Sequence, residues 1–221
     1  MRVYEMLEKM GEFFDARIGG YEEHQLTCID FAEEFYPFTA ACLPQIPGTR
    51  LLDLGCGTGL ELGYYFETVP SAEITGIDLA PGMLGVLRKK FPDKPMTLIT
   101  GSYFDVPFGE NAFDAAVSVE SLHHFTKEEK TPLYEKLRKA LKPDGFFILT
   151  DYFALSAEEE RAHRAELLRL KKEQNITDGA FYHYDTPLTV AHETEALIDA
   201  GFSSAAVLKS WGATYTLKAI R

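Results

Sequence analysis

Three glycines at alternate positions follow a short apolar run, and an aspartate precedes them. Residues 51–59 read LLDLGCGTG. A short apolar run bounded by glycine is more typical of a buried strand than of a helix. Glycine adopts positive φ at low cost and, because it lacks a Cβ, allows a ligand to contact the backbone. The amides at the start of the next helix then face a negative or strongly polar group. The stretch therefore predicts a strand, a ligand-binding turn and a helix.

The spacing of these glycines separates two kinds of nucleotide-type site. The dinucleotide fingerprint Gly-x-Gly-x-x-Gly needs a third glycine at position 60, which is Leu60 here, and no lysine follows as in a phosphate loop. The pattern Asp-x-Gly-x-Gly-x-Gly over residues 53–59 instead resembles motif I of the class I S-adenosylmethionine-dependent methyltransferases. An ordinary tight turn between a strand and a helix is the alternative interpretation.

Asp78 stands at the end of the next predicted strand, residues 72–78. A carboxylate at this place accepts hydrogen bonds from ribose hydroxyls in dinucleotide folds, and the resemblance implies the same role here. The alternative role is a helix cap, since another predicted helix follows. The family commonly places an aspartate at the adenine amino group, but Ser102 occupies that place here. The adenine contact is therefore left open between Ser102 and Tyr103, with Asp105 as a possible substitute.

The fourth predicted strand carries a second set of polar residues. Residues 113–119 read FDAAVSV and residues 120–125 read ESLHHF, which resembles the post-core motif of small-molecule methyltransferases, such as those acting on quinones. The Asp/Asn-Pro-Pro-Tyr/Phe motif of enzymes that methylate adenine amines or glutamine side chains is absent. The Pro-Cys pair of cytosine carbon-5 methylases, which supplies a thiolate nucleophile, is absent too.

No catalytic residue is assigned, because methyl transfer relies largely on holding both partners in attack geometry. His123 and His124 are candidates for a general base, since neutral imidazole is available near pH 7. The alternative is that one of them packs beside the cofactor and the other is a loop histidine whose hydrogen bonds are satisfied.

The resemblance implies S-adenosylmethionine as the cofactor and a set of residues around it. The predicted cofactor-binding residues are Tyr21, Asp53, Gly55, Cys56, Gly57, Gly59, Asp78, Leu79, Met83, Ser102, Tyr103 and Glu120. The three cysteines have no metal-type spacing, and no metal site is predicted.

The order of predicted elements favours an α/β fold. The hydrophobic pattern predicts five strand–helix repeats. The resemblance implies a Rossmann-like, seven-stranded, mostly parallel sheet with helices on both faces and an N-terminal helical cap. We predict one domain over residues 1–221. Its parts are the helical cap (1–46), the cofactor-binding core (50–153), a helical and loop insertion (154–188), and a last helix with a closing strand pair (189–221).

Two segments outside the repeats are rich in aromatic and polar side chains, residues 17–24 and residues 181–185. Because a methyl donor must be kept from water, we expect both segments to close over the site. Tyr21 is expected near the charged end of the cofactor with Arg17 beside it, and Tyr182 or Tyr184 is expected to face the acceptor.

The alternative is that the first 46 residues only pack against the sheet. Tyr4, Leu7, Met10 and Phe14 recur at helical intervals, and a second helix is predicted over residues 21–43.

Composition limits the partners. The chain has 221 residues, a net charge of −12 and a pI of about 5.0. An acidic field of this size disfavours nucleic acid as a partner. An odd number of cysteines suits a reducing cytoplasm, and no apolar run is long enough to span a membrane. We expect a cytoplasmic monomer or homodimer that acts on a small-molecule acceptor.

Three functions stay open at this stage. A methyltransferase acting on a small metabolite is favoured. A non-catalytic S-adenosylmethionine-binding module has the same binding motifs. An NAD(P)-dependent Rossmann oxidoreductase is disfavoured by Leu60, which stands in place of the third glycine of the dinucleotide fingerprint.

Overall fold

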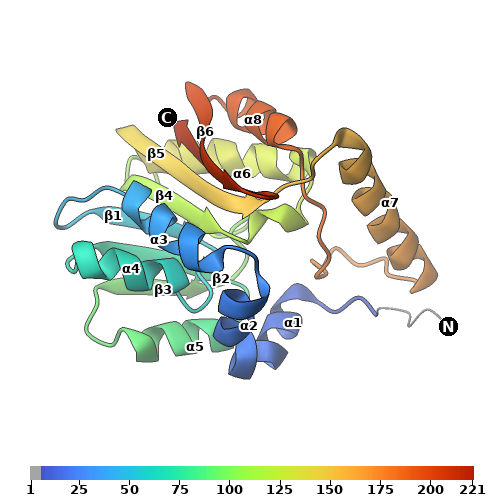
Figure 1. Ribbon diagram of the computed structural model, residues 1–221, viewed down its shortest axis with the longest axis horizontal. Coiled ribbons are helices and arrows are strands. Elements are labelled where there is room, and N and C mark those ends of the chain that lie inside the picture. Colours follow the sequence, from blue (N-terminus) through green and yellow to red (C-terminus); the bar gives the residue numbers. More distant parts are fainter. Residues whose placement is uncertain (1–5) are drawn as a thin grey trace.

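A seven-stranded sheet with helices on both faces forms the body of the molecule (Figure 1). The computed structural model describes residues 6–221. The strand order is β3-β2-β1-β4-β5-β7-β6, with parallel pairing from β3 to β5 and antiparallel pairing of β7 with both β5 and β6. The strands are β1 (Arg50–Leu54), β2 (Glu73–Asp78), β3 (Met96–Thr100), β4 (Phe113–Val119), β5 (Leu141–Tyr152), β6 (Ser204–Trp211) and β7 (Thr214–Ile220). The predicted fold class is confirmed.

The helices divide between the two faces of the sheet. α3, α4 and α5 pack on one face, and α6 and α8 pack on the other (Figure 1). The helices are α1 (Met10–Arg17), α2 (Tyr21–Cys28), α3 (Ala32–Cys42), α4 (Leu60–Thr68), α5 (Pro81–Lys90), α6 (Lys127–Ala140), α7 (Ala157–Glu173) and α8 (Val190–Asp199), with the short 3-10 helices η1 (Ile18–Gly20) and η2 (Leu122–His124). No helix within residues 6–221 is long and apolar enough to cross a membrane.

The strand order locates the region where a ligand would bind. The chain runs outward from β1 through β2 to β3 and then returns to β4 on the other side of β1. In open α/β sheets, ligands bind beyond the carboxyl ends of the strands at such a reversal. The glycine turn after β1 and the histidines after β4 both lie at this edge.

The N-terminal helices differ from the expected pattern. The helix predicted over residues 21–43 is two helices, because the chain turns at Phe31, which has a left-handed φ of 64°. α1 begins at Met10 and continues through Gly11. A Cβ on Gly11 would lie 3.2 Å from the carbonyl oxygen of Leu79, so glycine permits close packing of α1 on this loop. Tyr4 lies outside the described residues.

A buried ion pair joins α6 to α8. Lys130 Nζ lies 2.5 Å from a carboxylate oxygen of Glu193, and both side chains are almost completely buried. The Tyr134 hydroxyl donates a hydrogen bond to the other oxygen of Glu193. The pair is therefore compensated inside an apolar interface where either charge alone would be costly.

We predict that Glu193→Gln destabilises the fold strongly. The amide keeps the size of the side chain but leaves the Lys130 ammonium buried without a counter-charge, which costs about 3–5 kcal/mol. The free energy of unfolding from urea denaturation measures this cost. Glu195→Gln is the matched control, because Glu195 pairs with Lys127 in a partly exposed position and its loss costs about 1 kcal/mol or less. Equal stability of the two variants would contradict the prediction.

Candidate active site

The glycine turn after β1 is fixed to the end of β2. Gly55, Gly57 and Gly59 have φ values of 73°, 48° and 69°, which are costly for other residues. The Gly55 amide donates to the Ile77 carbonyl oxygen at 2.8 Å. A Cβ on Gly55 would lie 2.0 Å from Oγ of Ser121, so only glycine fits there. We call residues 55–59 the glycine loop.

Asp78 holds the glycine loop through its side chain. One carboxylate oxygen accepts from the Gly57 amide at 2.9 Å, and the other accepts from the Ala80 amide at 2.8 Å. Burial raises the pKa of Asp78, although the two amides act in the opposite direction. The carboxylate therefore positions the loop and also caps the turn into α5.

A small cavity of about 40 Å³ lies between the glycine loop and α1. Most of the predicted cofactor-binding residues line it, namely Tyr21, Gly55, Gly57, Asp78, Leu79, Met83, Tyr103 and Glu120. Met10, Phe14, Ser121 and His124 also line it and were not predicted as cofactor-binding residues. Met10 and Phe14 carried only a helical packing signal in the sequence, which does not distinguish a cavity wall from core.

The other four predicted residues, Asp53, Cys56, Gly59 and Ser102, do not line this cavity. Cys56 is buried against Gly76, where an added Cβ would meet its sulfur at 2.7 Å. Gly59 is the N-cap of α4. Ser102 Oγ accepts the Phe104 amide at 3.1 Å and so caps its own turn.

Asp53 and Glu61 form a buried carboxyl pair beneath the glycine loop. The two side chains are within hydrogen-bonding reach of each other. One oxygen of each finds no partner among residues 6–221. Burial raises the pKa of both groups, and the Glu61 charge raises that of Asp53 further. The pair therefore favours a shared proton, and its contact with the loop is indirect.

A larger cavity of about 790 Å³ adjoins the small one. Phe14, Tyr21, Glu120 and His124 line both cavities. The rest of its wall comes from α1, α2, the turn before α3, the β6–β7 turn and the loop near residue 183. The two cavities therefore lie next to each other at the carboxyl edge of the sheet, with these four side chains between them.

His123 is oriented by a buried carboxylate. Its Nδ1 lies 2.5 Å from Oδ1 of Asp151, which is itself buried at the end of β5. Burial acts to lower the pKa of His123, but the Asp151 and Asp185 carboxylates outweigh it and raise that pKa well above its usual value. Because Nδ1 is held by Asp151, the other ring nitrogen, Nε2, points toward Asp185, 3.4 Å away.

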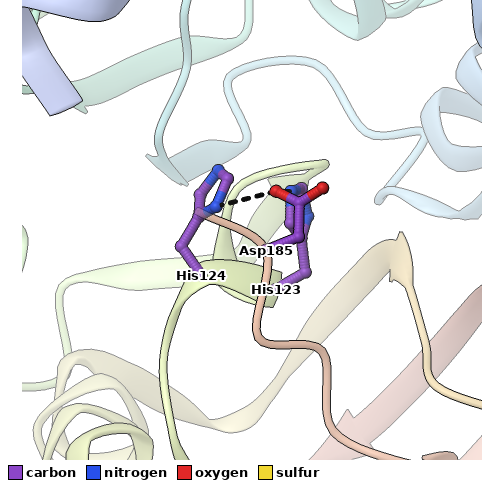
Figure 2. Close-up of side chains that lie close together, drawn as sticks. All are labelled: His123, His124 and Asp185. Atoms are coloured by element: carbon purple, nitrogen blue, oxygen red, sulfur yellow. Dashed lines mark ion pairs between the residues drawn. The ribbon is translucent and has the colours of Figure 1, made fainter. Parts of the chain in front are cut away.

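His124 and Asp185 complete this cluster (Figure 2). His124 Nδ1 lies 3.2 Å from Oδ1 of Asp185 and 3.1 Å from the carbonyl oxygen of Tyr184. Burial lowers the pKa of His124, and the neighbouring His123 lowers it further. The cluster joins the loop after β4 to the loop before α8.

Glu120 adds an unusual carboxyl to the wall of both cavities. It has a left-handed φ of 48°, and its Oε1 finds no hydrogen-bond partner in the described part of the chain. Burial raises the pKa of Glu120 to about 8, and the Asp151 charge contributes to the increase. Glu120 therefore combines a strained backbone with one unpaired carboxyl oxygen next to the histidines.

The loop near residue 183 presents different residues from those expected. Neither Tyr182 nor Tyr184 lines the large cavity, whereas His183 and Asp185 do. Tyr182 pairs with Lys9 in a β-bridge, and its hydroxyl donates to Asp178. In extended backbone, alternate side chains point to opposite sides. The side chains that face the cavity are therefore those of His183 and Asp185, each one residue after the tyrosine that was expected there.

Arg17 lines the large cavity but is engaged with its own segment. Its guanidinium pairs with Glu8 at 2.7 Å and lies 3.7 Å from the centre of the Phe13 ring. His183 stacks on Phe13 with a centroid distance of 3.5 Å. These contacts connect the N-terminal helices to the 181–185 loop along the wall of the cavity.

Known proteins resemble this chain in sequence and fold. A methyltransferase-domain family model matches residues 52–149. The chain is 30% identical over 141 residues to a fatty-acid O-methyltransferase of Mycolicibacterium smegmatis, covering 60% of this chain and 50% of the relative. It is 32% identical over 121 residues to a tRNA (carboxymethyluridine(34)-5-O)-methyltransferase of Arabidopsis thaliana, covering 54% of this chain and 28% of the relative. The chain thus spans half or less of the length of these two curated relatives.

Among solved structures, an S-adenosylmethionine-dependent methyltransferase of Mesorhizobium loti has the same fold. Its TM-score is 0.60 at 23% identity, with 84% of this chain and 96% of the other covered. The family match spans β1 to β5, which includes the glycine loop, Asp78 and the paired histidines. Residues 52–149 are therefore a methyltransferase domain of the class I S-adenosylmethionine-dependent type.

Proposed function

We propose that this chain transfers a methyl group from S-adenosylmethionine to a small-molecule acceptor held in the large cavity. The observation that carries the proposal is the shared wall of the two cavities, made by Phe14, Tyr21, Glu120 and His124. A donor beside the glycine loop and an acceptor in the large cavity would meet along this wall.

The residues of the small cavity suit the family's cofactor. Asp78 offers a half-buried carboxylate to ribose hydroxyls, and Leu79 and Met83 offer apolar contact to a base. Gly57 has no heavy atom within 3.7 Å of an added Cβ, which leaves its backbone open to a ligand. Tyr21 is the nearest side chain to that position. When bound, S-adenosylmethionine supplies an electrophilic methyl group on a sulfonium.

The large cavity suits an acceptor with both apolar and polar parts. Aromatic side chains, among them Phe13, Phe31 and Trp211, line one part of it, and His123 and Asp185 line another. A net charge of −12 opposes a polyanionic acceptor, which favours a small molecule over nucleic acid. A cytoplasmic location and a monomeric or homodimeric state stay predictions.

Catalysis by this site would depend mainly on positioning. The chain's part is to fix the two reactants in line and to exclude water with the N-terminal helices. Asp151 holds His123 in one orientation, which supports a role for His123 in positioning the acceptor. The same geometry supports a base only if the acceptor loses a proton during attack.

We predict that incubation of the protein with S-adenosylmethionine and a metabolite library releases S-adenosylhomocysteine, and that Asp78→Ala lowers the rate of release at least about tenfold at low donor concentration. Each lost hydrogen bond to the carboxylate costs roughly 1.5–3 kcal/mol, so the affinity for S-adenosylhomocysteine in calorimetry should fall at least about tenfold. Asp93→Ala is the control, because Asp93 is an exposed carboxylate that does not line either cavity.

The outcomes of this experiment separate the remaining functions. Tight binding of S-adenosylhomocysteine without turnover of any acceptor would indicate a binding module. Binding that is unchanged in Asp78→Ala would remove Asp78 from the site. Binding of reduced nicotinamide cofactor instead would favour the oxidoreductase.

We predict that Gly57→Val removes cofactor binding. Valine at a φ of 48° is strained, by roughly 1–2 kcal/mol, and its branched side chain projects toward the ligand position. Gly48→Val carries a similar strain, at a φ of 75°, in open space away from the site. Both variants should lose thermal stability, but only Gly57→Val should lose affinity for S-adenosylhomocysteine. Normal affinity in a folded Gly57→Val protein would show that the loop only turns the chain.

A further inference from the structure

Three side chains with metal-binding atoms converge on one point in the wall of the large cavity. Nε2 of His123, Nδ1 of His124 and an oxygen of Asp185 all lie within 4.8 Å of one another. Figure 2 shows the Asp185 carboxylate beside the His124 ring, with the His123 ring partly hidden behind it. Two of the ligands follow β4 and the third comes from the loop before α8, so no short sequence motif signals the cluster.

The distances within the cluster match those between ligands of one ion. The His123–Asp185 and His124–Asp185 contacts are 3.4 Å and 3.2 Å. Zinc binds imidazole nitrogen and carboxylate oxygen at about 2.0–2.2 Å in tetrahedral geometry, which places two ligand atoms roughly 3.3–3.5 Å apart. A good hydrogen bond between a ring nitrogen and a carboxylate is shorter, about 2.7–2.9 Å. Both contacts are therefore longer than that hydrogen bond and close to the spacing of two metal ligands.

The surroundings of His123 have the arrangement that metal-binding histidines use. Asp151 accepts the Nδ1–H of His123 at 2.5 Å, which fixes the ring and directs Nε2 at the cluster, where loss of its proton would leave a lone pair for the ion. Metal-ligating histidines commonly donate their second nitrogen to a carboxylate in this way. Asp151 also accepts the Leu122 amide at 2.8 Å, so the supporting carboxylate is itself fixed.

We propose that His123, His124 and Asp185 bind one divalent transition-metal ion of the zinc class. Two imidazoles and one carboxylate suit zinc or iron better than magnesium or calcium, which prefer oxygen ligands. On binding, Nε2 of His123 loses its proton to solvent. The ion replaces the Nδ1 proton of His124, which contacts the carbonyl oxygen of Tyr184, and Nε2 of the same ring takes up a proton, so that His124 stays neutral. The expectation of no metal site rested on cysteine spacing, which does not bear on this cluster.

The position of the cluster gives the ion a role toward the acceptor. All three ligands line the large cavity, together with Glu120 and Tyr152. A site with three protein ligands keeps a position for water or substrate. Resting on the proposed function, the ion would bind an oxygen of the acceptor and lower the pKa of its hydroxyl group. The acceptor class would then be a molecule with a hydroxyl or carboxylate next to an apolar portion.

Metal titration of the purified protein tests the proposal without any turnover. Protein dialysed against a chelator is titrated with Zn²⁺ by calorimetry and with Co²⁺ by visible absorption, which reports coordination number. We expect one ion per chain, with an affinity at least about tenfold lower in His124→Gln and in Asp185→Asn. His192→Gln is the matched control, because His192 pairs with Glu160 at 2.8 Å away from the cavity. Its affinity should equal that of the unmodified protein.

Two results would overturn the proposal. One is the absence of binding tighter than about 100 µM by the unmodified protein, a result that does not depend on whether the variants fold. The other is equal affinity in all variants, which would indicate an ion bound elsewhere on the surface. Calorimetry with S-adenosylhomocysteine on the same samples keeps the two proposals separate. Cofactor binding without metal binding would overturn only the metal site, and the reverse result would overturn only the proposed function.

Discussion

One buried carboxylate, Asp151, organises the carboxyl edge of the sheet. It lies at the end of β5 and accepts from the Leu122 amide, the Tyr152 amide and Nδ1 of His123. Burial acts to raise the pKa of Asp151, but the His123 charge and hydrogen bond outweigh it and lower that pKa. The ionised form is therefore favoured, and it fixes the loop after β4 on the strand beside it. The strained backbone of Glu120, one residue beyond β4, persists because both ends of this loop are held.

The N-terminal helices and the 181–185 loop act as one wall around this edge. Backbone hydrogen bonds join Met10 to Phe181 and His183 to Glu8. On the other side, Asp15 accepts the Gly82 amide of α5, and Glu22 pairs with Lys90. The N-terminal helices are thus attached to the sheet through α5 on one side and to the 181–185 loop on the other. A change at either attachment is transmitted to both cavities.

The sequence predicted those parts of the site that depend on local backbone chemistry. Gly55, Gly57 and Gly59 need positive φ, and Asp78 ends a strand next to them, so spacing alone identified their place. The strands were predicted for the same reason, since buried parallel strands are short apolar runs. The break at Phe31 was missed because its left-handed φ has no glycine to signal it. Tyr182 and Tyr184 were chosen over His183 and Asp185 because composition does not determine which side of an extended loop faces inward. The contact of Asp185 with the histidines depends on tertiary packing between distant segments, which no local pattern encodes.

Phe14 and Tyr21 lie next to the glycine loop, and this position affects the rate at which a ligand can bind there. The space beside the loop is about 40 Å³, whereas ligand pockets are usually roughly 300–1,000 Å³. A nucleoside-sized molecule that contacts Gly57 would therefore need Phe14 and Tyr21, which line this space, to move outward first. Its association rate constant would fall below the diffusion limit, and the observed rate of association would level off at the rate of opening as the ligand concentration rises. Departure would pass through the same opening, so donor exchange becomes a step that sets the turnover rate when transfer itself is fast.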